Sequence, residues 1–167
     1  MITKNIDEQH VVEKIIADSK VCHVSMIDGE GMPYVLPMNF GYQDDRIYLH
    51  SAREGGHIRA LRQNPNVCII FTSNPSLAYQ HEEVACSYRM KGFSLMCRGQ
   101  VWFEEDFDEK VKALNIIMKQ YTGKAFTYSA PAIKNVMVWI VEIESLSAKA
   151  FGAQNPRSPH CKDGSIF

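Results

Sequence analysis

The chain has 167 residues, of which 46% are hydrophobic and 22% are charged, as expected for one globular domain with its own core. Its formal net charge of -1 excludes the strong positive field that favours nucleic acid or an anionic membrane, so we expect neither partner. No apolar run reaches the ~20 residues of a membrane span, and no signal-peptide pattern follows Met1. The five scattered cysteines favour reduced thiols in a cytoplasmic protein, and none has zinc-site spacing.

The first third of the chain predicts one helix followed by short strands. Asp7 is the expected N-cap of a helix ending near Asp18, because apolar residues recur at helical spacing. Residues 21–27 and 32–42 then alternate as two strands joined by a glycine-rich turn. Prolines at 33 and 37 make the second strand irregular or place it at an edge, and residues 47–51 form a third strand.

The remainder adds two helices and three strands. A helix from residue 54 ends before Pro65. A second helix spans 107–121, where apolar residues share one face and Gly123 provides a stop. Strands are predicted at residues 67–71, 93–104 and 136–143, with loops at residues 74–83 and 124–135. Strands and helices do not alternate strictly, which favours an antiparallel barrel with helices outside it. We expect one domain over residues 1–152, with residues 153–167 as its C-terminal tail.

The junction between the third strand and the following helix has the composition of an anion site. Gly55 and Gly56 allow close approach of the backbone, and a helix N-terminus offers unpaired N–H groups with a partial positive charge. By residue types alone, a plain strand-to-helix turn with solvated arginines is the favoured alternative. The nearby side chains that could assist are those of His50, Ser51, Arg53, His57, Arg59 and Arg62.

The same region carries a family resemblance. The segments LPMNFGY (36–42), IYLHSA (47–52) and residues 54–68 resemble the pyridoxamine 5′-phosphate oxidase-like flavin proteins, in the order and spacing of that family. The similarity is greatest to the branch of 5-nitroimidazole resistance (Nim-type) proteins. Later matches at Arg98-Gly99, at residues 107–121 and at residues 136–149 extend it over most of the chain.

The resemblance implies a mainly β fold, a six-stranded antiparallel split β-barrel, and a homodimer that holds FMN in a groove lined by both subunits. FAD is the alternative flavin, since an extended groove would admit its adenylate. Many relatives carry lysine where His57 stands, and often histidine where Gly56 stands. The expectation is therefore either a lower phosphate affinity or compensation for the missing cation by Arg53 or Arg59.

The resemblance also assigns residues to parts of the cofactor. The segment 37–40 is expected along the isoalloxazine ring, 50–52 near the ribityl chain and phosphate, and 56–58 at the phosphate. Cys97, Arg98 and Trp139 are also assigned to the cofactor, but each of them could instead serve only the core or the surface. The predicted cofactor-binding residues are Pro37, Met38, Asn39, Phe40, His50, Ser51, Ala52, Gly56, His57, Ile58, Cys97, Arg98 and Trp139.

The resemblance favours a flavin-dependent oxidoreductase in which NAD(P)H reduces the flavin and a small planar acceptor, such as a nitroaromatic, reoxidises it. No G-x-G-x-x-G motif is present, so nicotinamide would bind transiently. His50 is the predicted catalytic residue, as a proton donor or acceptor. The alternatives are a non-catalytic flavin-binding or redox-sensing module, and a haem-binding split barrel with His50 or His23 as axial ligand.

Overall fold

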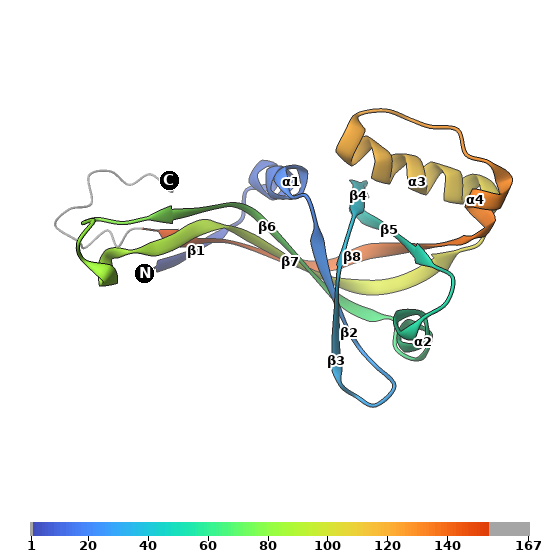
Figure 1. Cartoon of the computed structure of the whole chain (residues 1–167), viewed down its shortest axis with the longest axis horizontal. Coiled ribbons are helices and arrows are strands. Elements are labelled where there is room, and N and C mark those ends of the chain that lie inside the picture. Colours follow the sequence, from blue (N-terminus) through green and yellow to red (C-terminus); the bar gives the residue numbers. More distant parts are fainter. Residues whose placement is uncertain (1, 154–167) are drawn as a thin grey trace. The chain divides into compact units, whose positions relative to one another are not determined.

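The computed structural model describes residues 2–153, so the predicted tail lies outside the described residues from position 154 onward. Strands dominate, which confirms the mainly β class (Figure 1). In chain order the elements are β1 (Ile2–Ile6), α1 (Gln9–Asp18), β2 (Cys22–Ile27), β3 (Pro33–Met38), β4 (Phe40–Gln43), β5 (Arg46–Ala52), α2 (Gly56–Gln63), β6 (Asn66–Ala78), η1 (Ala85–Ser87), β7 (Arg89–Glu104), α3 (Phe107–Thr122), α4 (Ala130–Lys134) and β8 (Val136–Ala153).

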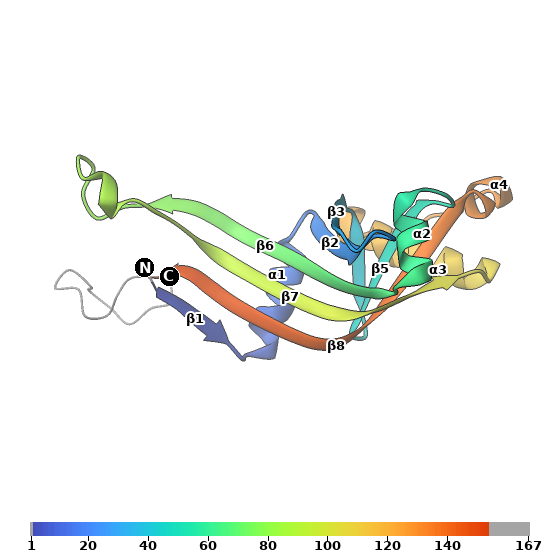
Figure 2. The same ribbon diagram turned by 90° about the horizontal axis from the view of Figure 1, so that it is seen from below.

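The strands form one sheet in the order β3-β2-β6-β7-β8-β5-β4, with β1 paired to β8. The strands β6, β7 and β8 lie side by side along much of their length (Figure 2). Pairings of β2 with β3, β4 with β5, and β5 with β8 are antiparallel. The described residues thus contain eight strands where six were expected. The two additional strands are β1, which was not predicted, and the product of a break at Asn39 that divides residues 32–42 into β3 and β4.

Several predicted boundaries are wrong, and most errors shorten strands. Residues 74–78 belong to β6 rather than to a loop, and β8 continues ten residues beyond residue 143. Polar residues in these segments interrupt the alternation that predicts a strand. Pairing with strands distant in sequence, rather than local pattern, sets the full length of β6 and β8. In that region a Cβ at Gly92 would lie 2.8 Å from Cζ of Phe151, so glycine permits the close approach. The N-cap of α1 is Glu8 rather than Asp7, and α4 occupies part of a predicted loop.

The described chain divides into two compact units. The first contains residues 2–19, 71–96 and 147–153. Its helix α1 buries Val12, Ile15 and Ile16, the apolar stripe expected from their spacing. At the end of α1 the buried Ser19 hydroxyl lies 2.7 Å from the Ile15 carbonyl and donates to it. This bond satisfies a polar group that burial would otherwise leave unpaired.

The second unit contains residues 20–70 and 97–146, and it holds every residue predicted for the cofactor. Its helix α3 packs on β4 and β5 (Figure 1) and buries Ala113, Leu114 and Ile117. The Asp106 carboxylate caps the start of α3 by accepting two backbone N–H groups, and Gly123 ends it at φ 68°, which confirms the predicted stop. None of the helices within residues 2–153 has both the length and the apolar character required to cross a bilayer.

Candidate anion site at the start of helix α2

The turn between β5 and α2 leaves a helix start open to a ligand. Gly55 precedes the helix at φ 142°, a conformation that residues with a side chain rarely adopt. No side chain caps the first turn of α2, and no acidic residue lies in it. A Cβ added at Gly56 would meet nothing within 4 Å, so open space lies beside the backbone there. The N–H groups of this first turn are therefore available to an anion.

A cavity of about 440 Å³ lies at this turn and is rich in arginine. We call it the arginine cavity. Three arginines and a single acidic residue line it, and guanidinium groups bind phosphate through paired, charge-assisted hydrogen bonds. Arg62 was predicted only as a nearby cation, whereas here it lines the cavity. The lining residues are Arg53, Glu54, Gly55, Ile58, Arg59, Arg62 and Met137.

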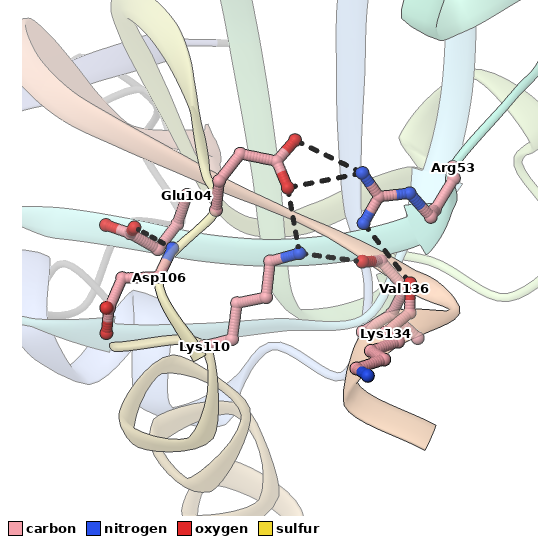
Figure 3. A network of polar contacts seen from close by, with 7 residues as sticks. Arg53, Glu104, Asp106, Lys110, Lys134 and Val136 are labelled. Carbon is pink, nitrogen blue, oxygen red and sulfur yellow. Dashed lines mark hydrogen bonds and ion pairs between the residues drawn. The ribbon is translucent and has the colours of Figure 1, made fainter. Parts of the chain in front are cut away.

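Arg53 is held by a network that sequence analysis did not anticipate (Figure 3). Its guanidinium donates to the Glu105 carboxylate at 3.2 Å and to the Lys134 carbonyl at 3.2 Å. Lys110 is buried, with only 2% of the residue exposed. Its ammonium group lies 3.2 Å from the same carboxylate and 3.3 Å from the Val136 carbonyl. Arg53 is thus bonded directly to two other segments of the second unit, at Glu105 and Lys134, so its guanidinium is oriented before any ligand binds.

The charge of Glu105 is stabilised by its two cationic neighbours. Desolvation alone would raise the pKa of its carboxyl, but hydrogen bonds and charge from Lys110 and then Arg53 lower this pKa overall. Glu105 therefore stays ionised at neutral pH. It neutralises part of the positive charge of Arg53, so Arg59 and Arg62 supply most of the net positive charge of the arginine cavity.

Ser51 is the centre of a hydrogen-bonded group that we call the serine cluster: Ser51, Ala52, His57 and Trp139. The Ser51 hydroxyl donates to the Ala52 carbonyl at 2.7 Å and accepts the Trp139 indole N–H at 3.1 Å. The Nε2 atom of His57 lies 3.1 Å from the same oxygen. Since the only hydrogen of the hydroxyl goes to Ala52, His57 must donate, which places its proton on Nε2. The hydroxyl of Ser51 is therefore fully engaged inside the protein.

His57 is a neutral member of this cluster. Desolvation lowers its pKa, a bond to the Ala52 backbone acts in the opposite direction, and the positive charge of Arg59 lowers the pKa further. Its ring lies 5.5 Å, centroid to centroid, from the ring of the fully buried Trp139. Phe103 packs edge-on against the same indole. His57 thus packs against the core instead of supplying the missing cation.

His50 lies on the opposite face of β5 from Ser51, because successive side chains of a strand alternate. It pairs with Val138 of β8, whose side chain belongs to the core beneath α3 together with Tyr48. The side chain of His50 is exposed, yet partial desolvation lowers its pKa. The imidazole is therefore neutral at neutral pH and able to accept a proton.

The segment expected along the isoalloxazine ring alternates between exposed and buried side chains. Pro37 and Asn39 are exposed, whereas Met38 and Phe40 are buried. The Phe40 N–H donates to the Tyr121 hydroxyl at 3.0 Å, and that hydroxyl donates to the Lys20 carbonyl. Tyr121 was not predicted to take part. It lies 81 residues from Phe40 in the chain, and no local pattern signals this pairing.

The residues predicted on β7 point in different directions. Cys97 is buried and Arg98 is exposed. Burial raises the pKa of the Cys97 thiol to about 12, with a smaller contribution from Cys68, so the thiol stays protonated at neutral pH. Of the other predicted residues, Ile58 is on the buried face of α2, and Ala52 is exposed. Within the described chain, neither His50 nor Cys97 forms a hydrogen bond to the serine cluster.

A family model described as pyridoxamine 5′-phosphate oxidase matches residues 8–150. The chain belongs to this family. Membership confirms the resemblance inferred from the motifs around β5 and α2, and it identifies the mainly β fold as the split barrel expected of the family. Among curated proteins, none matches the chain.

Solved structures agree with this family assignment. A proposed 5-nitroimidazole antibiotic resistance protein from Bacteroides thetaiotaomicron is 48% identical, with a TM-score of 0.81, and the match covers 89% of this chain and 87% of that one. A flavocytochrome from Azotobacter vinelandii is 21% identical, with a TM-score of 0.73 and coverage of 87% and 68%. A FAD- and haem-binding protein from Mycobacterium smegmatis is 14% identical, with a TM-score of 0.75 and coverage of 87% and 72%. The last two support the fold alone.

Proposed function

We propose that this member of the pyridoxamine 5′-phosphate oxidase family binds a flavin nucleotide, FMN in the first instance, with the phosphate in the arginine cavity. One observation carries the proposal: three arginines line a cavity at the uncapped N-terminus of α2. A phosphate dianion is the group that this combination of helix N–H donors and guanidinium groups suits best. The names of the similar structures, a flavocytochrome and a FAD- and haem-binding protein, are consistent with a flavin ligand.

The residues present fit such a phosphate. Open space beside Gly56 lets an anion reach the backbone, and Arg59 and Arg62 provide charge that the neutral His57 lacks. Arg53 is oriented by Glu105 and the Lys134 carbonyl, which reduces the entropy lost when it binds. The exposed side chains of Pro37 and Asn39 are free to contact a flat ring. Arginine thus takes the place of the lysine found in many relatives.

We further propose a flavin-dependent oxidoreductase that acts on a small planar acceptor, such as a nitroaromatic, with NAD(P)H as electron donor. A bound flavin would supply hydride and electron transfer. The residues of the chain would hold the phosphate, orient the ring and manage protons. His50, neutral at neutral pH, is the proposed proton acceptor. The 48% identity to a proposed 5-nitroimidazole resistance protein supports the choice of acceptor class.

The proposed assembly is a homodimer with the flavin at its interface.

Haem is the second candidate ligand. The name of the similar Mycobacterium smegmatis protein supports the haem alternative. An exposed histidine on a strand, His50 or His23, would then serve as axial ligand. Flavin and haem have distinct absorption spectra, so one measurement separates them.

The test begins with the purified full chain. Its absorption spectrum and the mass of the cofactor released on denaturation identify the ligand. Its molar mass in solution tests the proposed homodimer. Bleaching of the flavin colour by NADH or NADPH, followed by reoxidation with a nitroaromatic, supports the oxidoreductase. A flavin that stays oxidised supports the non-catalytic alternative. A colourless protein that takes up no added FMN would contradict the proposed function.

A further inference from the structure

A larger cavity, of about 740 Å³, lies in the same unit between α3 and the sheet face formed by β5, β8 and β7. It shares no lining residue with the arginine cavity, and no residue assigned to the flavin lines it. Its volume lies in the range typical of small-molecule pockets. We call it the α3 pocket. Its chemistry differs from that of the arginine cavity and indicates a different ligand.

The floor and one wall of the α3 pocket are suited to a flat, apolar ring. Tyr48 and Ile140 from the sheet and Ala113 from α3 form an almost fully buried floor. Trp102 stands at the side with 37% of its surface exposed. The Arg46 guanidinium lies 5.6 Å from the Trp102 ring centroid, in a cation–π contact that orients the indole. An aromatic ring would bury this indole surface, which is otherwise left in water.

The charges around the pocket favour an anion at one of its ends. Four basic and two acidic side chains line it, for a formal charge of +2. Lys112 is paired with Glu109 at 2.6 Å, whereas Lys119 and Lys124 form no ion pair within residues 2–153. Lys119 lies in the last turn of α3, about 15 Å along the helix from Glu109, and Lys124 follows directly after Gly123, which ends the helix. A negative group at the lysine end avoids the acidic end.

The form of the anion follows from the available donors. No helix N-terminus opens into the lysine end, because the residues there close the C-terminus of α3. A phosphate dianion would lack backbone N–H donors and would be repelled by the two carboxylates at the other end. A carboxylate, with a single charge, requires only the two ammonium groups. We infer that the α3 pocket binds a planar aromatic carboxylate, with its ring against Trp102 and its carboxylate at Lys119 and Lys124.

The experiment uses the two tryptophans of the chain as reporters. In the ¹⁵N-labelled full chain, each indole gives one N–H signal, and the Trp102→Phe variant identifies that of Trp102. The probe is 2-naphthoate, titrated with and without excess FMN. We expect a saturable shift of the Trp102 signal, with that of Trp139 unchanged, and the same affinity under both conditions.

Matched variants and a neutral probe test the charge. We expect Lys119→Gln with Lys124→Gln to weaken 2-naphthoate binding about tenfold, whereas Lys14→Gln, in the other unit, has no effect. The neutral 2-naphthamide should bind as weakly to the unaltered chain as 2-naphthoate binds to the double variant. Absence of a saturable shift, equal binding of acid and amide, or displacement by FMN would overturn the inference. The result does not depend on whether the protein binds flavin.

Discussion

The serine cluster and the arginine cavity are neighbours around the start of α2, yet they differ in how their polar groups are satisfied. In the serine cluster, the hydroxyl of Ser51 donates to the Ala52 carbonyl and accepts hydrogen bonds from His57 and Trp139. In the arginine cavity, Arg59 and Arg62 line open space beside an uncapped helix start. The difference shows that one motif can contain both polar groups bonded within the fold and polar groups left available, and that hydrogen-bond satisfaction distinguishes them.

The largest effect is expected from removing the two arginines that Glu105 does not hold. Arg59→Gln with Arg62→Gln should weaken FMN binding about 100-fold, if each charge-assisted bond contributes about 1.5 kcal/mol. Riboflavin, which lacks the phosphate, should bind with unchanged affinity. Equilibrium titration of both ligands measures this difference, with Lys14→Gln as the surface control. An equal loss for both ligands would place the phosphate elsewhere.

The serine cluster should respond in stability instead. Ser51→Ala leaves the buried Trp139 N–H without its acceptor and also removes the partner of His57, at a cost of about 1–3 kcal/mol in the free energy of unfolding. Urea unfolding of the protein without ligand gives this quantity. The ratio of FMN to riboflavin affinity should stay constant, and a change in it would make Ser51 a phosphate ligand after all.

Arg53 lies between the two cases, because it lines the cavity and is also bound internally. Arg53→Gln should cost less FMN affinity than the double arginine variant, and about 1 kcal/mol of stability through loss of the partly exposed pair with Glu105. Urea unfolding and FMN titration of Arg53→Gln and Glu105→Gln together separate the two roles. Both substitutions break the pair between Arg53 and Glu105, and Glu105→Gln also leaves the buried Lys110 without its carboxylate, but only Arg53→Gln removes a cation from the cavity. Equal effects on FMN affinity would show that Arg53 has no direct part in binding.

The smallest effect concerns pH. His50 and His57 have pKa values below their ordinary value of 6.5 in the folded state, so the unfolded chain binds more protons as pH falls. Their contribution to stability is fully present above pH 6.5 and is lost as pH falls from there toward the folded pKa values. Urea midpoints measured across this window should decrease on acidification. Replacing both histidines by glutamine should flatten this dependence, and an unchanged slope would contradict the shifted pKa values.

Local patterns predicted many of the elements but not their full extent. The helix α3 was predicted because its apolar residues repeat at helical spacing and Gly123 marks its end. The strands β6 and β8 were predicted too short, since polar residues such as Asn74 and Glu144 interrupt the alternation. Cross-strand pairing extends both strands, and a pairing partner cannot be inferred from the strand alone.

The candidate site divides in the same way. The glycine pair and the arginines near residue 55 allowed an anion site, because helix starts and guanidinium groups have this chemistry wherever they occur, but only the family resemblance favoured it over a plain turn. The pairing of Lys110 with Glu105 could not be predicted, since a buried lysine looks like any other helical lysine in sequence. Strand alternation alone would have placed His50 and Ser51 on opposite faces of β5.

What the sequence determined by itself is therefore the family, through motifs in a set order and spacing, and the class of fold. The tertiary structure decided which polar groups remain available. The β5–β8 register, with Ser51 opposite Met137, brings Trp139 to the serine hydroxyl from 88 residues away. A hydroxyl has one hydrogen and two lone pairs, so such distant partners decide whether it binds a ligand or supports the fold.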